Sequence, residues 1–176
     1  MYGVKHFISC ANGTDAIYIA LKSLDIGVGD EVITVANTWI STAETISQTG
    51  AEPIFVDIDP KTYNIDTSMI EEKITKKTKA IIPVHLFGQA VKMDEIRDLC
   101  NRYSLFLIED CAISFGTKYK ESYIGTLGDI GFYSFGMFKF VSALNGGFIL
   151  TQNKEIYSKI CSIHSTFNES NFFFRA

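Results

Sequence analysis

The stretch Leu105-Phe106-Leu107-Ile108-Glu109-Asp110 sets four apolar residues ahead of two carboxylates. Because no polar residue interrupts the apolar part, it predicts a strand buried on both faces, as in parallel sheets. Apolar residues at helical spacing occupy residues 92–103 just before it, and residues 79–84 form another short apolar run. A strand, a helix and a strand in this order predict a parallel pair covered by a helix.

The same alternation continues along the chain in both directions. Asn12-Gly13-Thr14 predicts the start of the first helix, Gly27 and Gly29 predict its end, and residues 111–128 are predicted as a loop. The further predicted elements are strands at residues 31–35, 53–57, 130–135 and 147–151, and helices at residues 16–24, 38–48, 68–74 and 154–162. We therefore predict an α/β fold, a mostly parallel sheet with helices on both faces, in which ligands bind at the carboxyl ends of the strands.

The composition narrows the class of protein. The chain has 176 residues, 47% of them hydrophobic, with 14 Phe, 8 Tyr and 1 Trp, so it can bury a core and is not disordered. Its net charge of -4 argues against a general binder of nucleic acid or of anionic membranes. No apolar stretch reaches the ~18 residues of a membrane span, and the start lacks an apolar signal core. The four cysteines form no CxxC pair, so we expect free thiols, a cytoplasmic location and no metal site.

The two ends of the chain predict a fragment. The start passes directly into an apolar segment, and Phe172-Phe173-Phe174 stand two residues before the last one. A complete small domain seldom leaves such an apolar patch uncovered. We therefore expect residues 1–176 to be one domain of a longer protein, truncated at both ends.

Lys139 is the only charged residue between Asp129 and Lys154, and phenylalanines flank it on both sides. Partial burial would lower the pKa of its amine and make it a nucleophile for a Schiff base. The alternative is a lysine that extends from an apolar edge to water, and the local pattern alone favours this alternative.

Other strand ends also carry candidate site residues, each with a structural alternative. Only one of Glu109 and Asp110 can face a given ligand, because successive strand residues point to opposite faces; alternatively, both cap the next turn. The N–H groups of Asn12-Gly13-Thr14 could bind a phosphate, or the triplet is a plain N-cap, and no GxGxxG or GxxxxGKS/T motif occurs. Trp39 could stack on a flat ring or pack in the core. His85 is expected to be a hydrogen-bonded structural histidine rather than a base or ligand.

Taken together, these strand ends offer a phosphate cradle, a flat aromatic ring, a carboxylate and a lone lysine. Pyridoxal phosphate needs these four groups, namely a phosphate site, a stacking face, an acid at its pyridine nitrogen and a lysine for a Schiff base. The combination favours this cofactor, although each feature alone favours its structural alternative.

In the sequence of these and neighbouring residues, the chain resembles the pyridoxal-phosphate-dependent sugar aminotransferases of the DegT/DnrJ/EryC1/StrS family. The order and spacing of the matching stretches agree across nearly the whole chain. These stretches are Asn12-Gly13-Thr14-Asp15-Ala16, Gly29-Asp30-Glu31-Val32-Ile33-Thr34, Thr38-Trp39-Ile40-Ser41-Thr42, Val56-Asp57-Ile58-Asp59, Ile82-Pro83-Val84-His85-Leu86-Phe87-Gly88-Gln89, Ile108-Glu109-Asp110-Cys111-Ala112, Gly128-Asp129-Ile130, and Tyr133-Ser134-Phe135 followed by Lys139. The resemblance implies the large domain of a fold-type I aminotransferase, without the smaller C-terminal domain.

The resemblance also implies a role for each site residue. Lys139 would form the Schiff base and shuttle a proton, Asp110 would keep the pyridine nitrogen protonated, and Trp39 would stack on the ring. Three residues would hold the phosphate: Gly13, Thr14 and Ser134. The implied reaction moves an amino group from an amino acid, usually glutamate, to the keto group of a nucleotide-linked sugar, and the implied assembly is a homodimer.

Two positions depart from the family pattern. Ile113 stands where the family usually has Gln or His, which hydrogen-bonds the phenolic oxygen of the cofactor, and Phe140 stands where Asn is typical. Isoleucine cannot form that bond, so one alternative is a non-catalytic truncated remnant or a regulatory module. A second alternative is a pyridoxamine-dependent sugar dehydratase. Such relatives usually have histidine in place of the lysine, so Lys139 argues against it.

Overall fold

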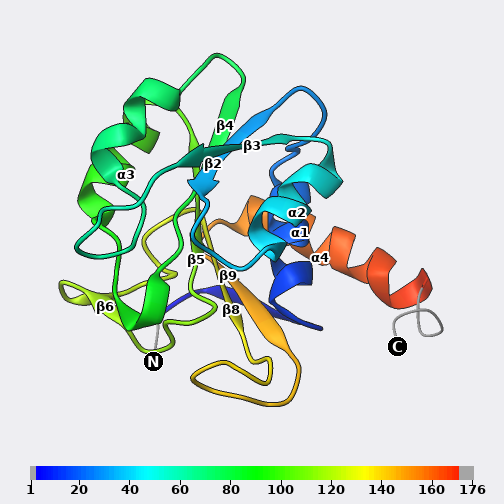
Figure 1. The fold of residues 1–176 in the computed structure, drawn as a ribbon. Coiled ribbons are helices and arrows are strands. Elements are labelled where there is room, and N and C mark those ends of the chain that lie inside the picture. Colours follow the sequence, from blue (N-terminus) through cyan, green and yellow to red (C-terminus); the bar gives the residue numbers. More distant parts are fainter. Residues whose placement is uncertain (1–2, 171–176) are drawn as a thin grey trace.

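A seven-stranded sheet forms the centre of the computed structural model, which describes residues 3–170 (Figure 1). The strand order is β1-β9-β8-β5-β4-β2-β3. These strands are β1 (His6–Cys10), β2 (Glu31–Val35), β3 (Glu52–Val56), β4 (Thr78–Ile82), β5 (Phe106–Asp110), β8 (Ile130–Ser134) and β9 (Gly147–Thr151). Strands β3, β2, β4, β5 and β8 pair in parallel, whereas β9 is antiparallel to both of its neighbours, β8 and β1. The prediction of a mostly parallel sheet is confirmed.

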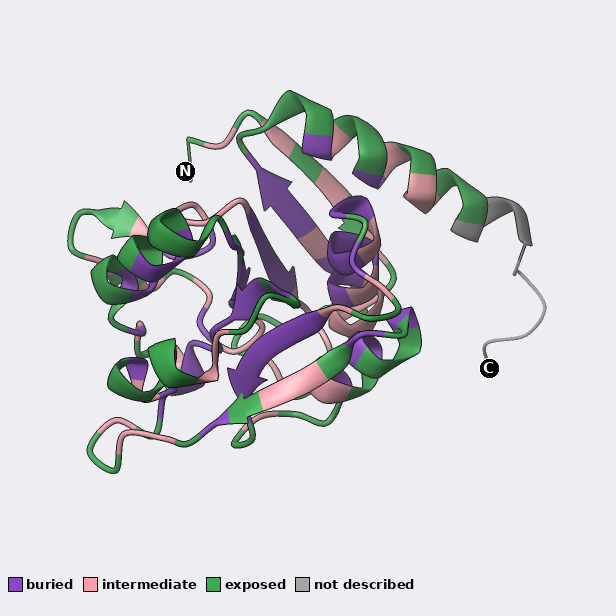
Figure 2. Ribbon diagram, turned by 90° about the horizontal axis from the view of Figure 1, so that it is seen from above, coloured by how far each residue is buried: buried purple, intermediate pink, exposed green. Residues whose placement is uncertain are grey.

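Helices cover both faces of this sheet, as Figures 1 and 2 show. Helices α1 (Gly13–Ser23), α2 (Ser41–Thr49) and α4 (Lys154–Ser170) contribute to the apolar core on one face, and α3 (Met93–Tyr103) contributes to the core on the other. Successive residues of β2 alternate between the two layers, since Val32 belongs to the first core and Ile33 to the second. Burial on both faces is the reason that the parallel strands have nearly continuous apolar sequences.

Some predicted helix boundaries are wrong. The helix predicted at 38–48 begins only at Ser41, because the preceding residues leave β2 as a loop. The helix predicted at 68–74 is a pair of 3-10 turns, η1 (Thr67–Met69) and η2 (Glu71–Lys73). A third such turn, η3 (Leu86–Gly88), follows β4, and α4 continues to Ser170 instead of ending at 162.

Two β elements were not predicted. Strand β1 alternates half-buried and exposed residues at the edge of the sheet, so it lacks the continuous apolar pattern of the inner strands. Its pairing with β9, 137 or more residues away, depends on the tertiary fold. The predicted loop at 111–128 contains a small antiparallel hairpin, β6 (Lys118–Tyr119) and β7 (Ser122–Tyr123). The predicted patch Phe172-Phe173-Phe174 lies outside the described residues.

The direction of the strands decides where a ligand site can form. Since β1 and β8 are both antiparallel to β9, β1 runs in the same direction as the parallel strands. The carboxyl ends of β1, β2, β4, β5 and β8 therefore lie along one edge of the sheet. The predicted site residues lie at one of these ends or shortly after it.

All four cysteines lie within the described residues. Cys10, Cys100, Cys111 and Cys161 are free thiols, and burial raises the pKa of Cys10 and of Cys100 to about 12. Within residues 3–170, every helix is too short or too polar to cross a bilayer.

Candidate active site

A cavity of about 110 Å³ lies at the carboxyl edge of the sheet, and all six residues predicted from the sequence line it. They are Gly13 and Thr14 of α1, Trp39 before α2, Asp110 of β5, Ser134 of β8 and Lys139 after β8. Two larger cavities, of about 550 and 460 Å³, lie elsewhere on the described part of the chain, and neither is lined by a lysine. The predicted site residues therefore gather in the smallest of these three cavities.

Hydroxyl groups and a helix start form one side of this cavity. The side chain of Asn12 accepts a hydrogen bond from the Asp15 backbone at 2.8 Å and so begins α1 at Gly13. A Cβ atom at Gly13 would lie 2.9 Å from the Cβ of Ser134, so only glycine allows α1 and β8 to approach this closely. The Thr14 hydroxyl donates to Ser41 Oγ at 2.9 Å. The free N–H groups of a helix start and nearby hydroxyls suit an anion such as phosphate.

Asp110 supplies the carboxylate of the cavity and is 4% exposed. The Ala112 backbone donates to its Oδ1 at 3.0 Å, and the Thr42 hydroxyl donates to its Oδ2 at 3.4 Å. Burial raises the pKa of Asp110, and the Ala112 hydrogen bond and the charge of Lys139 act in the opposite direction. Asp110 therefore offers a desolvated carboxylate as the hydrogen-bond acceptor for a cationic N–H group in the cavity.

We expect Asp110→Asn to stabilise the unliganded chain at neutral pH. Burial raises the folded-state pKa above its ordinary value of 3.8, so the wild-type chain loses stability as the pH rises from 3.8 through the folded-state pKa. Asparagine removes this titration, so the variant gains about 1 kcal/mol, or roughly 2–4 °C in Tm, at pH 7 and nothing at about pH 3. Thermal unfolding followed by circular dichroism across this pH range measures the difference. The same pH dependence in both chains would contradict it.

Lys139 lies half-buried in the loop that follows β8. Its backbone N–H donates to the Gly136 carbonyl at 3.0 Å, which closes a turn at the edge of the cavity. The flanking residues Phe138 and Phe140 are themselves exposed, so they do not bury the lysine as the local pattern suggested. The setting of Lys139 comes instead from distant parts of the chain that line the same cavity.

Trp39 is 71% exposed and lines the cavity. The alternative that it packs in the core is therefore wrong. Its position follows from the late start of α2, because residues 36–40 form the loop that carries the indole to the carboxyl edge. An exposed indole at a cavity can stack on a planar ligand.

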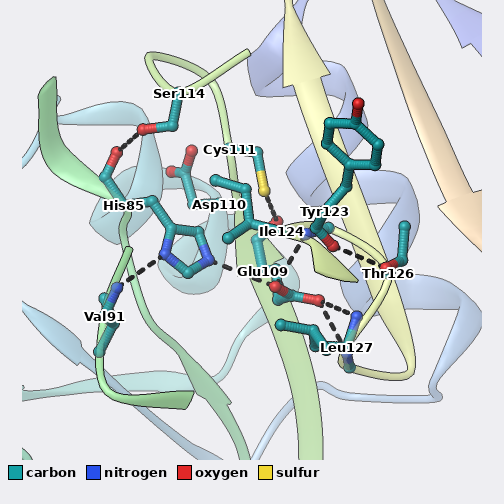
Figure 3. A network of polar contacts seen from close by, with 12 residues as sticks. His85, Val91, Glu109, Asp110, Cys111, Ser114, Tyr123, Ile124, Thr126 and Leu127 are labelled. Carbon is teal, nitrogen blue, oxygen red and sulfur yellow. Dashed lines mark hydrogen bonds and ion pairs between the residues drawn. The ribbon is translucent and has the colours of Figure 1, made fainter. Parts of the chain in front are cut away.

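Glu109 points away from this cavity and holds together a separate network, shown in Figure 3. Its carboxylate accepts a bond from His85 Nε2 at 3.3 Å, and His85 Nδ1 accepts one from the Val91 backbone at 3.1 Å. Three more backbone N–H groups donate to Glu109 at 2.7–2.8 Å: those of Gly125, Leu127 and Gly128. Because Nδ1 accepts, the proton of the neutral ring is on Nε2. His85 is thus hydrogen-bonded within the core, as the sequence analysis expects.

Cys111 lies near this network. Its Sγ atom, a ring nitrogen of His85 and a carboxylate oxygen of Glu109, each of which could bind a metal ion, lie within 4.8 Å of one another. The hydrogen bonds to the histidine and the carboxylate account for this cluster without a metal ion. We therefore assign it a structural role.

Two hydroxyl-bearing residues of the cavity were not predicted from the sequence, Ser41 and Thr42 of α2. Both belong to the stretch of residues 38–42 that resembles the family, in which only Trp39 received a role. Their hydrogen bonds to Thr14 and Asp110 join residues 27 and 68 positions apart. Sequence spacing alone could not reveal such contacts.

The chain matches the DegT/DnrJ/EryC1/StrS aminotransferase family over residues 1–171. It belongs to this family. It is 49% identical to a pleiotropic regulatory protein of Geobacillus stearothermophilus, over 88% of this chain and 42% of the relative. It is 46% identical to the GDP-perosamine synthase of Escherichia coli O157:H7, over 89% of this chain and 43% of that enzyme. The chain thus spans less than half the length of these curated relatives.

Solved structures agree with this assignment. The aminotransferase from Psychrobacter cryohalolentis superposes with a TM-score of 0.90 at 35% identity, over 99% of this chain and 46% of its own. NtdA from Bacillus subtilis, solved with bound cofactor PMP, gives a TM-score of 0.85 at 40% identity, over 89% of this chain and 35% of its own. The predicted class, that of fold-type I aminotransferases, is confirmed.

Proposed function

We propose that this chain is the cofactor-binding domain of a pyridoxal-phosphate-dependent aminotransferase that moves an amino group from an amino acid, glutamate, to the keto group of a nucleotide-linked sugar. One observation carries the proposal. The six residues predicted from the sequence come from five separate segments and line a single cavity at the carboxyl edge of the sheet. Such edges are where ligands bind in open α/β sheets.

The cavity fits this cofactor group by group. The start of α1, with the Thr14 hydroxyl, suits a phosphate, and the buried Asp110 carboxylate suits a protonated pyridine nitrogen. The exposed indole of Trp39 suits the flat ring, and Lys139 is the only lysine in the described lining. When bound, pyridoxal phosphate supplies an aldehyde that reacts with amines and a ring that stores an electron pair.

Each site residue has a separate role in the proposed reaction. Lys139 Nζ would be the amine that holds the cofactor and the base that moves a proton once it is free. Asp110 would accept a hydrogen bond from the protonated pyridine nitrogen and so keep the ring electron-poor. Trp39 and the start of α1 would hold the ring and the phosphate in place.

A second copy of the chain is proposed as the partner that completes this face. Apolar side chains of the loop around Lys139 are exposed, Phe138 by 91% and Met137, Phe140 and Leu144 by more than 60%. An apolar patch of this kind beside a site favours a protein interface. A homodimer would cover it and close the cavity toward solvent.

Intrinsic fluorescence tests cofactor binding, because Trp39 is the only tryptophan in the chain. We expect pyridoxal phosphate to quench this fluorescence with a Kd on the order of 10 μM. Pyridoxal without the phosphate should bind at least about tenfold more weakly, because it loses the charge-assisted hydrogen bonds at α1. Free N-acetyltryptophanamide corrects for light absorbed by the ligand. Equal affinity for the two compounds would contradict the assigned phosphate site.

Glutamate then tests the amino-transfer step. The chain with bound pyridoxal phosphate should have an absorbance band in the visible range. If the chain is an aminotransferase domain, glutamate removes this band and one 2-oxoglutarate per site is released. The second candidate function is a regulatory module that keeps the fold without the chemistry. Ile113, which packs against the core on the α3 side, and the name of the Geobacillus relative favour it. A visible band that persists with glutamate would select this second candidate.

A further inference from the structure

The first turn of α2 contacts three parts of the proposed cofactor site at once. Its residues Ser41 and Thr42 are adjacent, both line the cavity, and both are buried, Thr42 by 99%. The Thr42 backbone N–H also donates to the carbonyl of Trp39 at 3.1 Å. The backbone of Trp39 is therefore bonded to the same turn.

Thr42 lies against the carboxylate. Its hydroxyl donates to Asp110 Oδ2 at 3.4 Å, while Oδ1 is held by the Ala112 backbone. Each carboxylate oxygen of Asp110 thus has a donor of its own, and Thr42 supplies one of the two. The titratable groups that act on Asp110 from other parts of the chain are Lys139 and His85, and neither belongs to α2.

Ser41 lies against the Thr14 hydroxyl, on the α1 side of the cavity. Its Oγ accepts the proton of Thr14 Oγ1 at 2.9 Å, which leaves the lone pairs of Thr14 and the proton of Ser41 available to the cavity. Thr45, one turn further along, donates to the Ser41 carbonyl at 2.6 Å and fixes the turn that carries both residues.

We propose that the first turn of α2 is the positioning element of the cofactor site, in which Thr42 orients Asp110 and Ser41 orients Thr14. The inference rests on the proposed function, because the two contacts gain their meaning from a ligand with a phosphate and a pyridine nitrogen. Neither residue touches the reacting carbon, and each acts through its neighbour.

The Thr42 contact is tested in the unliganded full chain by carbon NMR titration of the Asp110 carboxyl group. Thr42→Val keeps the shape and removes the donor, so the pKa of Asp110 should rise by about 0.5, the equivalent of a modest hydrogen bond. Thr42→Ser should restore the wild-type titration. Thr49→Val is the matched control, because the Thr49 hydroxyl donates to Ile46 within the same helix. A wild-type titration in Thr42→Val would overturn this half of the inference.

The Ser41 contact is tested by the affinity for pyridoxal phosphate, read from Trp39 fluorescence. We expect Ser41→Ala to weaken binding about fivefold and to leave the affinity for pyridoxal unchanged, since the latter lacks the phosphate. Unchanged binding of pyridoxal phosphate in Ser41→Ala would overturn the second half alone. If the wild-type chain itself fails to bind, the proposed function and the Ser41 role both fail, whereas the titration of Asp110 still decides the role of Thr42.

Discussion

Lys139→Ala should abolish the visible absorbance band that the chain forms with pyridoxal phosphate. Lys139 is the only lysine that lines the described cavity, so its replacement removes the one amine that can hold the aldehyde carbon there. Borohydride treatment followed by peptide mass spectrometry should place the reduced cofactor on Lys139 in the wild-type chain. The variant should retain no fixed cofactor at that peptide and no amino transfer from glutamate.

Binding and covalent attachment should separate in this variant. The start of α1, Trp39 and Asp110 remain, so pyridoxal phosphate should still quench the fluorescence of Lys139→Ala, with about tenfold lower affinity. Lys139→Arg keeps the positive charge near Asp110 but has no nucleophilic amine at neutral pH, so it should also lack the band. Lys154→Ala, at the exposed start of α4, is the matched control and should behave as wild type. A band that survives in Lys139→Ala would reject the assignment.

Local sequence patterns predicted six of the seven strands of the sheet and the site edge, because these depend on short-range rules. Strand β2 coincides with its predicted residues, since continuous apolar runs with β-branched residues have few alternatives. Parallel strands bring their carboxyl ends together, so residues that follow strand ends meet even when 127 positions separate Asn12 from Lys139. The family resemblance then gave each of these residues a role.

Contacts set by three-dimensional packing could not be predicted in this way. The burial of Lys139 does not come from its phenylalanine neighbours, which are exposed, and the Thr42 bond to Asp110 spans 68 positions. Strand β1 forms because β9 offers it an edge, while its own sequence has only a half-buried alternation. The sequence did not show which of Glu109 and Asp110 faces the cavity. Only the structure shows that Asp110 does and that Glu109 faces the His85 network.

The second large effect is expected for Glu109→Ala. The carboxylate accepts three backbone N–H bonds and one from His85, and Glu109 has no exposed surface. Alanine would leave these donors without partners, at about 1–3 kcal/mol for each buried group. A loss of roughly 3–5 kcal/mol is a large share of the 5–15 kcal/mol that stabilise a typical domain. Urea unfolding followed by circular dichroism should therefore show a much lower midpoint.

Two further variants serve as comparisons for Glu109→Ala, one that keeps part of the hydrogen bonding without the charge and one at an exposed glutamate. Glu109→Gln keeps one carbonyl oxygen, which can still accept the bonds of Leu127 and Gly128, but its amide group would meet the N–H of Gly125. It should therefore fall between alanine and wild type. Glu121→Ala, in the exposed turn of the β6–β7 hairpin, should change stability by less than about 0.5 kcal/mol. Equal midpoints for Glu109→Ala and Glu121→Ala would show that the network does not stabilise the fold. Because Asp110 follows Glu109 directly in β5, the same network also holds the strand end that carries the Asp110 carboxylate of the cavity.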